Sequence, residues 1–291
     1  MVTVRKLILS FIFGRHGTIH IGMKLLNGSE LAGFIKERQA HEVRALRQSQ
    51  HVLPKLAIVV TIDHPAIDVY VRMKRRYGAD ILADVALYRV DQSSVPDLLQ
   101  KLNADPTVHG IIVQLPLEDP SETDAITSMV APEKDVDALG RQAIYDPATP
   151  MAILWLLAGY NIDFPGKHIV LVGHGKLVGA PLERMLRASG YDVTVVDRKT
   201  PDLEAALLQA DIIITATGTP GLITPAMIKQ GAVVVDAGVA GEQGKTVGDL
   251  DPAVYERDDI TITPQKGGVG PLTICALFDN VIRAARATAG Q

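Results

Sequence analysis

Short apolar runs recur along the chain with helical patterns between them, and this alternation limits the folds that the sequence can adopt. Parallel strands that are buried on both faces consist almost entirely of apolar residues. The alternation of such runs with helices therefore predicts an α/β protein with parallel sheets. Strands are expected at residues 56–60, 85–88, 110 to about 114, 169–172, 193–196, 212–215, 233–236 and 260–262.

Helices are expected between these strands. Ser29 is a candidate N-cap for a helix at residues 30–49, because its hydroxyl can accept a hydrogen bond from a backbone N–H of the first turn. A turn at residues 63–65 precedes a second helix that runs to about Tyr77. Further helices are expected at residues 94–103, 152–157 and 272–288.

The chain divides into two domains at a break in this pattern. With 291 residues it is long enough for two domains of ordinary size. The alternation stops after Asp137, and a new strand–helix–strand pattern starts at Lys167. We expect a first α/β domain at residues 23–146, a second at 147–271, and a final helix at 272–291 that packs back on the first domain. Residues 1–22 are expected to be a dispensable extension.

Composition argues against several classes of protein and site. The single cysteine, Cys275, cannot form an intramolecular disulfide or a cysteine-based zinc site, and the histidines show no metal-ligand spacing, so no metal is expected. The net charge of −4 argues against nucleic acid as the main partner. No run of about 18 apolar residues is present, so we expect no membrane-spanning helix. The N-terminal segment lacks a signal-peptide cleavage site, which favours a cytoplasmic protein.

One amide side chain lies at the end of the third predicted strand. Pro116 cannot donate to a sheet ladder, so the strand must end near Gln114. Ligands bind at the carboxyl ends of the strands in open α/β sheets, which makes Gln114 a candidate binding residue. The alternative is a core amide whose hydrogen bonds are satisfied within the protein.

Two further candidates lie in the first domain. Tyr70 and Lys74 are four residues apart on a predicted helix and share one face. Burial beside apolar groups favours a neutral amine, which suits proton transfer, whereas the alternative is a solvated lysine beside a half-buried tyrosine. Asp137 shares a loop with Asp135, and both are solvated loop acids in the simplest interpretation.

A glycine-rich turn opens the second domain. Residues 173–179 have the spacing GxGxxxG between a predicted strand and a predicted helix. Glycines let the backbone approach a pyrophosphate, the helix N-terminus supplies N–H donors, and an acid after the second strand commonly binds a ribose hydroxyl. A plain tight turn is the alternative, but the strand–turn–helix context favours a dinucleotide. The residues assigned to the cofactor are Gly173, His174, Gly175, Lys176, Val178, Gly179, Asp197, Arg198, Thr217 and Val239.

The order of these motifs resembles the bifunctional methylenetetrahydrofolate dehydrogenase/cyclohydrolase (FolD-type) family from about Met23 to Ala289. The family's Y-x-x-x-K matches Tyr70 to Lys74, its V-Q-L-P-L matches residues 113–117, and its K-D-V-D matches residues 134–137. Its G-D-V corresponds to residues 248–250, and its glycine-rich P-G-G-V-G-P-M-T corresponds to residues 266–273.

The resemblance implies an α/β catalytic domain and a Rossmann-type dinucleotide-binding domain, a folate cleft between them, and a homodimer built through the cofactor domains. It implies NADP- or NAD-dependent oxidation of methylenetetrahydrofolate, followed by hydrolysis to 10-formyltetrahydrofolate. Lys74 would be the acid/base of hydrolysis, Gln114 its hydrogen-bond partner, Tyr70 a stacking platform and Asp137 a pterin ligand. The folate and nicotinamide would lie against the turn formed by Gly267, Gly268, Val269 and Pro271.

Departures from the family pattern concentrate around the cofactor. His174-Gly175 replaces an arginine and a serine, and Asp197-Arg198 replaces a histidine and a serine. Ala138 replaces a glycine, and Lys266 replaces a proline. These departures leave the choice between NADP and NAD open. They also leave two alternatives to a bifunctional enzyme, which are a monofunctional dehydrogenase or cyclohydrolase and a non-catalytic folate- or nucleotide-binding relative.

Overall fold

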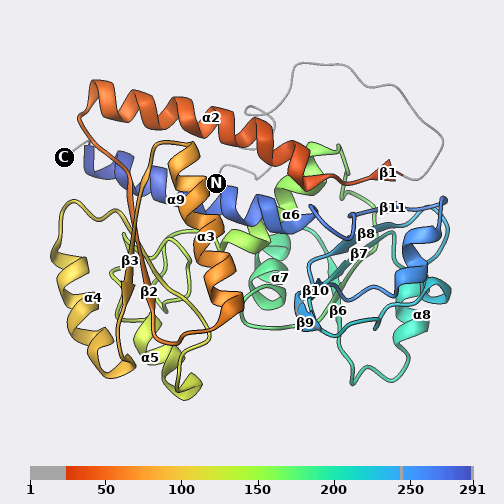
Figure 1. Cartoon of the computed structure of the whole chain (residues 1–291). Coiled ribbons are helices and arrows are strands. Elements are labelled where there is room, and N and C mark those ends of the chain that lie inside the picture. Colours follow the sequence, from red (N-terminus) through yellow and green to blue (C-terminus); the bar gives the residue numbers. More distant parts are fainter. Residues whose placement is uncertain (1–23, 243–244, 290–291) are drawn as a thin grey trace. The chain divides into compact units, whose positions relative to one another are not determined.

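The computed structural model describes residues 24–242 and 245–289, which form two compact units (Figure 1). Unit 1 comprises residues 24–32 and 149–273, and unit 2 comprises residues 33–148 and 274–289. Both are built on parallel sheets with helices, which confirms the predicted α/β class. The expected extension at residues 1–22 lies outside the described residues. Two helices, α2 (Gly28–Ser49) and α9 (Val269–Ala289), begin in unit 1 and continue in unit 2.

Unit 2 contains a three-stranded parallel sheet in the order β3-β2-β4. Its central strand is buried because it carries only apolar residues after its first position, as expected for a strand covered on both faces. The strands are β2 (Lys55–Val60), β3 (Asp84–Arg89) and β4 (Gly110–Val113). The helices are α3 (Pro65–Asp80), α4 (Val95–Ala104) and α5 (Thr123–Thr127), with 3₁₀ turns η1 (Gln92–Ser94) and η2 (Pro120–Glu122).

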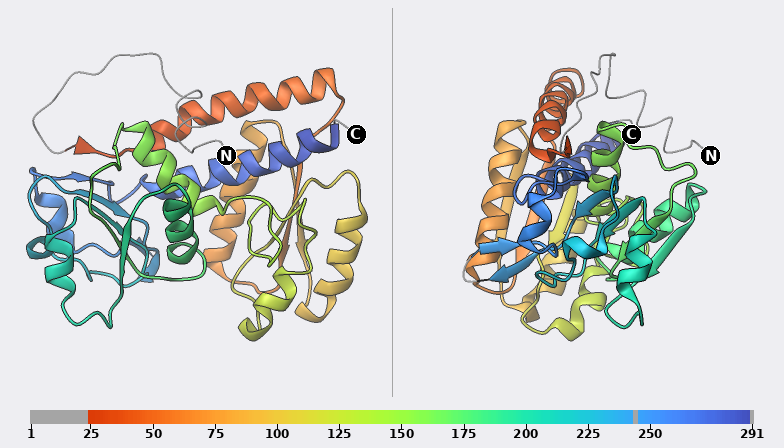
Figure 2. Two further views of the ribbon diagram at one scale, coloured as in Figure 1. Left: turned by 180° about the vertical axis from the view of Figure 1, so that it is seen from behind. Right: turned by 90° about the vertical axis from the view of Figure 1, so that its right-hand side faces the viewer.

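Helices cover both faces of this sheet. Figure 2 shows α4 in yellow on one side of the three strands and α3 in orange on the other. Ala57 and Val59 of β2 point to the α4 side, where they pack with Val95 and Leu99. On the other side, a side chain at Gly78 of α3 would collide with Val85, so the helix backbone lies directly on β3.

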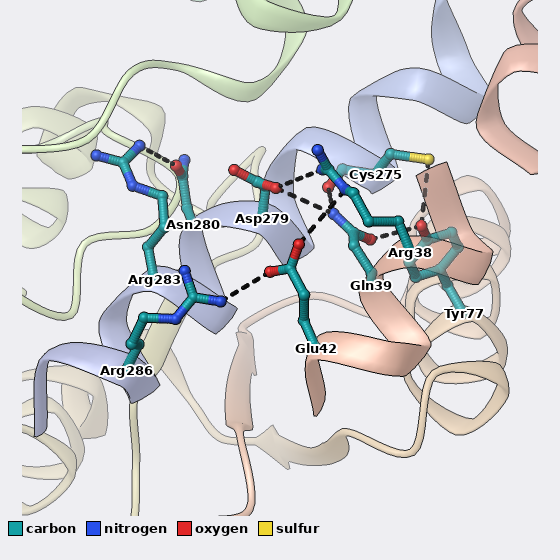
Figure 3. A network of polar contacts seen from close by, with 9 residues as sticks. All are labelled: Arg38, Gln39, Glu42, Tyr77, Cys275, Asp279, Asn280, Arg283 and Arg286. Atoms are coloured by element: carbon teal, nitrogen blue, oxygen red, sulfur yellow. Dashed lines mark hydrogen bonds and ion pairs between the residues drawn. The ribbon is translucent and has the colours of Figure 1, made fainter. Parts of the chain in front are cut away.

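A buried polar network links α2, α3 and the C-terminal part of α9 (Figure 3). Gln39 is fully buried; its Nε2 donates to the Cys275 carbonyl at 2.9 Å, and its Oε1 accepts from the Tyr77 hydroxyl at 2.7 Å. Arg38 forms an ion pair with Asp279 at 3.0 Å on the outer side of the same contact. A buried amide with both ends bonded specifies one arrangement of its neighbours, so the network fixes α3 against α2 and α9.

Unit 1 contains a six-stranded parallel sheet in the order β1-β11-β8-β7-β5-β6. The chain leaves β5 to form β6 on one side and then crosses to form β7 on the other. The carboxyl ends of β5 and β7 therefore flank the switch point, where α/β sheets bind ligands. The strands are β1 (Lys24–Leu25), β5 (Ile169–Val172), β6 (Val193–Val196), β7 (Ile212–Thr215), β8 (Val233–Asp236) and β11 (Thr261–Ile262).

The remaining elements of unit 1 pack around this sheet (Figure 2). One core cluster joins Val170, Ile213 and Val234 of three neighbouring strands to Leu207 of α8 and Val254 of η4. An antiparallel hairpin follows β8. These elements are α6 (Ala148–Gly159), α7 (Gly179–Ala188), α8 (Leu203–Leu208), η3 (Pro225–Met227), β9 (Ala240–Glu242), β10 (Lys245–Val247) and η4 (Pro252–Glu256).

The predicted cap of the first helix is wrong. The helix begins at Gly28, and the Asn27 side chain accepts a hydrogen bond from the Glu30 N–H at 3.2 Å. Ser29 lies inside the first turn, and its N–H donates instead to the Gly267 carbonyl at 2.8 Å. Asparagine is as good a cap as serine, so the neighbouring turn decides where the helix starts.

Several other boundaries differ from the sequence expectation, among them the starts of the last helix and the last strand. The last helix begins at Val269 rather than at 272, because Pro271 is tolerated in a first turn, where the missing N–H needs no partner. The last strand begins at Thr261 rather than at 260. The strand β1 and the β9–β10 hairpin were not expected, since strands of two or three residues carry too little periodic pattern to recognise.

Candidate functional site

The amine of Lys74 lies 2.7 Å from the side-chain carbonyl oxygen of Gln114. Lys74 comes from α3, and Gln114 follows the last residue of β4, so a helix and a strand end bring them together. The Gln114 N–H donates to the Val59 carbonyl at 2.9 Å, and its Nε2 donates to the Leu115 carbonyl at 3.1 Å. These bonds orient the amide so that its oxygen, the acceptor, faces the lysine.

Asp137 lies near enough to Lys74 that each group shifts the pKa of the other. Burial lowers the pKa of Lys74, and the Asp137 carboxylate partly counteracts this by favouring the charged amine. Burial raises the pKa of Asp137, and the Lys74 charge counteracts that shift. The site therefore holds a base and an acid whose neutral forms are both more accessible than in water, which suits proton transfer.

The loop that carries Asp137 is fixed by its neighbour Asp135. The buried Asp135 carboxylate accepts hydrogen bonds from the Gly140 N–H at 2.8 Å and the Leu139 N–H at 3.3 Å. Burial raises the pKa of Asp135. Ala138, between Asp137 and Leu139, has φ of +57°, in the left-handed region that favours glycine. Asp135 is thus a structural residue, and the solvated interpretation of it is wrong.

Lys134 is also structural. Its amine is buried and donates to three backbone carbonyls at the end of α4, those of Leu102 at 3.0 Å, Asn103 at 2.8 Å and Asp105 at 2.7 Å. Carbonyls of a last helical turn have no partner within the helix, so the amine closes that end of α4. Of the K-D-V-D motif, only Asp137 has its charge directed to the Lys74 site.

Helix α9 also supports the loop that carries Asp137. The Asn280 Nδ2 donates to the Val136 carbonyl at 3.0 Å and to the Asp146 carbonyl at 2.9 Å. A side chain at Gly110 would clash with Val136, so the start of β4 also packs directly against the loop. The position of Asp137 therefore depends on buried contacts from two elements distant in sequence.

Tyr70 lies on α3 one turn before Lys74, as the spacing predicted. The residue is 39% exposed, so it is accessible from solvent. Sequence reasoning missed the supporting residues Lys134, Asp135 and Asn280. The K-D motif offered a signal for the first two, but nothing near Asn280 marks it.

The glycine-rich turn of unit 1 contains two glycines required by its own packing and one that leaves space. Gly173 has φ of +95°, and a side-chain carbon there would lie 2.9 Å from the Ala216 carbonyl oxygen. A side chain at Gly179 would collide with the Gly173 carbonyl. A side-chain carbon at Gly175 would meet no atom within 4 Å. The turn thus presents an open backbone before the N-terminus of the ten-residue α7, which fits a dinucleotide pyrophosphate.

A buried acid, Asp249, and a half-buried acid, Asp236, organise the loops next to this turn. The fully buried Asp249 accepts from the Thr215 hydroxyl at 2.5 Å, the Thr217 N–H at 2.7 Å and the Thr219 N–H at 2.9 Å. Asp236 accepts from the Asp249 N–H at 3.1 Å, and burial raises its pKa. Asp249 belongs to the G-D-L motif, whose role the sequence did not reveal. Its role here is to hold the loop after β7.

The other assigned cofactor residues surround the turn. The His174 Nε2 lies 2.6 Å from the Glu183 carboxylate on α7. The Asp197 carboxylate accepts from the Lys199 N–H at 2.8 Å, within the exposed turn that follows β6. Exposed members of the set are His174, Gly175, Lys176, Asp197, Arg198 and Val239; half-buried members are Val178 and Thr217; buried members are Gly173 and Gly179.

The second glycine-rich turn packs on the start of α2. Gly267 has φ of +83°, and a side-chain carbon there would lie 2.5 Å from the Ser29 hydroxyl. A side chain at Gly28 would collide with the Gly268 carbonyl. These glycines therefore have a structural reason as well as the predicted ligand contact. Val269 is buried and Pro271 is half-buried in the first turn of α9.

Within residues 24–242 and 245–289, no three histidine, cysteine or acidic side chains are grouped so that they could hold a metal ion. None of the helices in these residues is both long enough and apolar enough to cross a membrane.

Two family models match the chain. The catalytic domain of tetrahydrofolate dehydrogenase/cyclohydrolase matches residues 26–137, and the NAD(P)-binding domain of the same family matches residues 147–289. The bifunctional protein FolD of Geobacillus thermodenitrificans is 39% identical over 92% of this chain and 99% of its own length. That of Bordetella petrii is 37% identical over 92% of this chain and 96% of its own length.

Solved structures show the same likeness. The bifunctional methylenetetrahydrofolate dehydrogenase/cyclohydrolase of Campylobacter jejuni has a TM-score of 0.85 and 35% identity, over 91% of this chain and 99% of the other. The Trypanosoma brucei enzyme, solved with NADP and an inhibitor, has a TM-score of 0.85 and 29% identity; the match covers 91% of this chain and 98% of the other.

Proposed function

The chain belongs to the tetrahydrofolate dehydrogenase/cyclohydrolase family, and from this premise we propose that Lys74, Gln114 and Asp137 carry its hydrolytic chemistry. The protein is an NAD(P)-dependent methylenetetrahydrofolate dehydrogenase and methenyltetrahydrofolate cyclohydrolase of one-carbon metabolism. The observation that carries the assignment of residues is the 2.7 Å contact between the Lys74 amine and the Gln114 carbonyl oxygen.

Hydrolysis requires a group that moves protons. A water oxygen adds to the methenyl carbon and loses a proton, and the ring nitrogen that leaves gains a proton as its bond to carbon breaks. Lys74 can do both, because burial lowers its pKa and the neutral amine accepts a proton that the ammonium later returns. Gln114 offers only its carbonyl oxygen to the amine, so it holds the group in place without competing for its lone pair.

Asp137 and Tyr70 are proposed to hold the substrate. A carboxylate can accept paired hydrogen bonds from the amino-pyrimidine edge of a pterin, and Asp137 is aimed by the loop that Asp135 closes. The partly exposed Tyr70 ring offers a face for stacking one turn from the amine. The contacts predicted for Gly267, Gly268, Val269 and Pro271 with folate and nicotinamide stay predictions.

Oxidation requires positioning rather than acid catalysis. Bound NAD(P) supplies the hydride acceptor, and residues Gly173 to Gly179 would hold its pyrophosphate at the start of α7. Lys74 need give no proton in this step. We also propose that the family's preference for NADP is weakened here, because His174 and Gly175 supply fewer donors to a 2′-phosphate than arginine and serine do.

Two assays test the proposal. Loss of methenyltetrahydrofolate absorbance measures hydrolysis, and its gain from methylenetetrahydrofolate with NAD or NADP measures oxidation. Both activities are expected. Hydrolysis without oxidation, or the reverse, would identify a monofunctional enzyme, and absence of both would identify a binding protein.

The remaining expectations about assembly and location stay proposals. The family resemblance supports a homodimer built through the cofactor domains, and light scattering should then give twice the mass of one chain. The cytoplasmic location and the dispensable residues 1–22 rest on sequence alone. A chain that starts at Met23 tests the latter, because it should melt and turn over like the full chain.

A further inference from the structure

We propose that Glu183 is a specificity-determining residue of the cofactor site, which acts with His174 to disfavour a 2′-phosphate and so to favour NAD over NADP. The inference rests on the proposed function, in that it takes the turn at residues 173–179 as the dinucleotide site. It adds a residue outside the glycine-rich motif, on the second turn of α7.

The contact between the two side chains is short and polar. The His174 Nε2 lies 2.6 Å from one carboxylate oxygen of Glu183, and the Arg187 Nε lies 2.8 Å from the other. The Glu183 side chain is only 20% exposed, so its contacts are not screened as fully as those of a free surface acid. The bonds to Arg187 and His174 lower the pKa of Glu183, which keeps the carboxylate charged at neutral pH.

We infer the place of this pair relative to the adenosine ribose from the contact between the turn and β6. The Gly173 N–H donates to the Val196 carbonyl at 2.8 Å, so the turn that carries His174 lies beside the end of β6. Asp197 follows at once, where an acid typically contacts the ribose hydroxyls of a dinucleotide. A phosphate on the 2′-hydroxyl would therefore enter the space bordered by His174 and Asp197.

The charges around this space do not suit a phosphate. A protonated His174 is neutralised by Glu183, and a neutral His174 offers no charge. Arg187 is engaged elsewhere, since its guanidinium also donates to the Val193 carbonyl at 2.6 Å and lies 3.3 Å from Asp192. The exposed Lys176, Arg198 and Lys199 each lie within two residues of His174 or Asp197, and they explain why we expect NADP to bind weakly rather than not at all.

A purely structural role for Glu183 gives a different expectation. Ion pairs at this degree of exposure contribute little to stability, and their loss has no reason to separate two nucleotides that differ by one phosphate. Selectivity between such ligands is therefore the readout that distinguishes the two roles.

The test compares Glu183→Gln with the unchanged chain by calorimetric titration of adenosine 2′,5′-bisphosphate and of AMP. Glutamine keeps the size and a hydrogen bond to His174 but removes the charge. We expect affinity for the bisphosphate to rise about fivefold, the effect of one partly exposed charge contact. Affinity for AMP should change less than twofold. The ratio of kcat/KM for NADP to that for NAD should rise in parallel.

Asp163→Asn is the matched control, because the exposed Asp163 precedes β5 at the amino end of the sheet, opposite the turn. It removes the same charge and should change neither affinity. His174→Ala gives a second measurement: it keeps the Glu183 charge, so bisphosphate affinity should not rise. Equal changes for both ligands in Glu183→Gln, or the same gain in Asp163→Asn, would overturn the proposal. If the unchanged chain binds neither ligand, the cofactor assignment of the turn fails, and this proposal fails with it.

Discussion

The two proposed ligand-binding regions both lie at the carboxyl ends of parallel strands, but they are built differently. In unit 2, side chains are proposed to carry the chemistry: Lys74 and Gln114 are joined by a hydrogen bond, and Asp137 lies close enough to Lys74 to raise its pKa. In unit 1, the backbone of the turn at residues 173–179 is proposed to carry the binding, and most side chains around it are exposed. A site made of side chains cannot change its residues without changing its chemistry, whereas a backbone site can.

This difference accounts for the departures at residues 174, 175, 197 and 198, which surround the proposed cofactor turn. The Y-x-x-x-K, Q-L-P-L and D-V-D residues are retained, whereas the arginine and serine after Gly173 are replaced. Gly173 and Gly179, which the turn needs for its own packing, are retained. Under the proposed assignments, cofactor choice can therefore change while the fold of the turn and the proposed hydrolytic site stay the same.

The largest effect expected is that of Lys74→Met on hydrolysis. The substitution keeps an apolar stem and removes the amine, so cyclohydrolase turnover should fall by about 10²–10⁴-fold, the usual contribution of positioned acid–base catalysis. Hydride transfer should fall less, because it takes no proton from Lys74. Stopped-flow absorbance of methenyltetrahydrofolate measures hydrolysis, and NAD(P)H formation measures hydride transfer.

Lys101→Met on α4 is the control, since that lysine is exposed. It should hydrolyse at the rate of the unchanged chain. If Lys74→Met does the same, the comparison between a side-chain site and a backbone site breaks down.

Lys134→Met should produce the largest loss of stability. Three carbonyls at the end of α4 would lose their donor, and each buried unsatisfied acceptor costs about 1–3 kcal/mol, reduced where water can reach it. We expect the free energy of unfolding of unit 2 to fall by about 2–4 kcal/mol in urea titrations. A change below 0.5 kcal/mol would show that solvent replaces the amine.

Asp137→Asn should move the pH dependence of hydrolysis. Turnover should rise with pH as Lys74 loses its proton, with an inflection below the ordinary lysine value because burial lowers the pKa. The Asp137 carboxylate raises the Lys74 pKa, so its removal should move the inflection to lower pH. Profiles of kcat against pH measure this, with the exposed Asp97→Asn as a control that leaves the inflection in place. An upward shift in Asp137→Asn would contradict the proposed pairing.

The smallest effect expected is that of Ala138→Gly. Ala138 has φ of +57°, and a non-glycine residue in that region costs about 1 kcal/mol. Glycine removes this cost but loses more chain entropy on folding, so stability should rise by at most about 1 kcal/mol. Ala45→Gly, on the exposed face of α2, makes the same chemical change in a helix and should destabilise by about 1 kcal/mol. Thermal melts of the two variants should therefore shift in opposite directions.

The sequence predicted the sheets better than the residues that support the site. The strands at 169–172, 193–196, 212–215 and 233–236 have the predicted bounds, because buried parallel strands are continuous apolar runs. The helix spacing correctly placed Tyr70 and Lys74 on one helix. The start of α2 and the contacts of Gly28 with Gly268 were not predictable, since they depend on two segments far apart in sequence.

The sequence also failed to predict which charged residues are buried. Lys134 and Asp135 look like loop residues in sequence, and only tertiary structure supplies the carbonyls and N–H groups that make their burial possible. Asn280 lies in a helix with no local sign of its two loop contacts. Sequence periodicity and motif spacing predict single helices, strands and turns. They do not predict the contacts by which these residues join one element to another.

The buried position of Cys275 makes its labelling a measure of how often the helices of the polar network in unit 2 separate. The thiol is fully buried, burial raises its pKa to about 11, and the Tyr77 hydroxyl lies 3.2 Å from its sulfur. A thiol-reactive dye can reach it only when α9 leaves α2 and α3. Because the chain has no other cysteine, every labelled molecule has opened in this way, and at dye concentrations where labelling is faster than reclosing the labelling rate gives the lifetime of the closed helices.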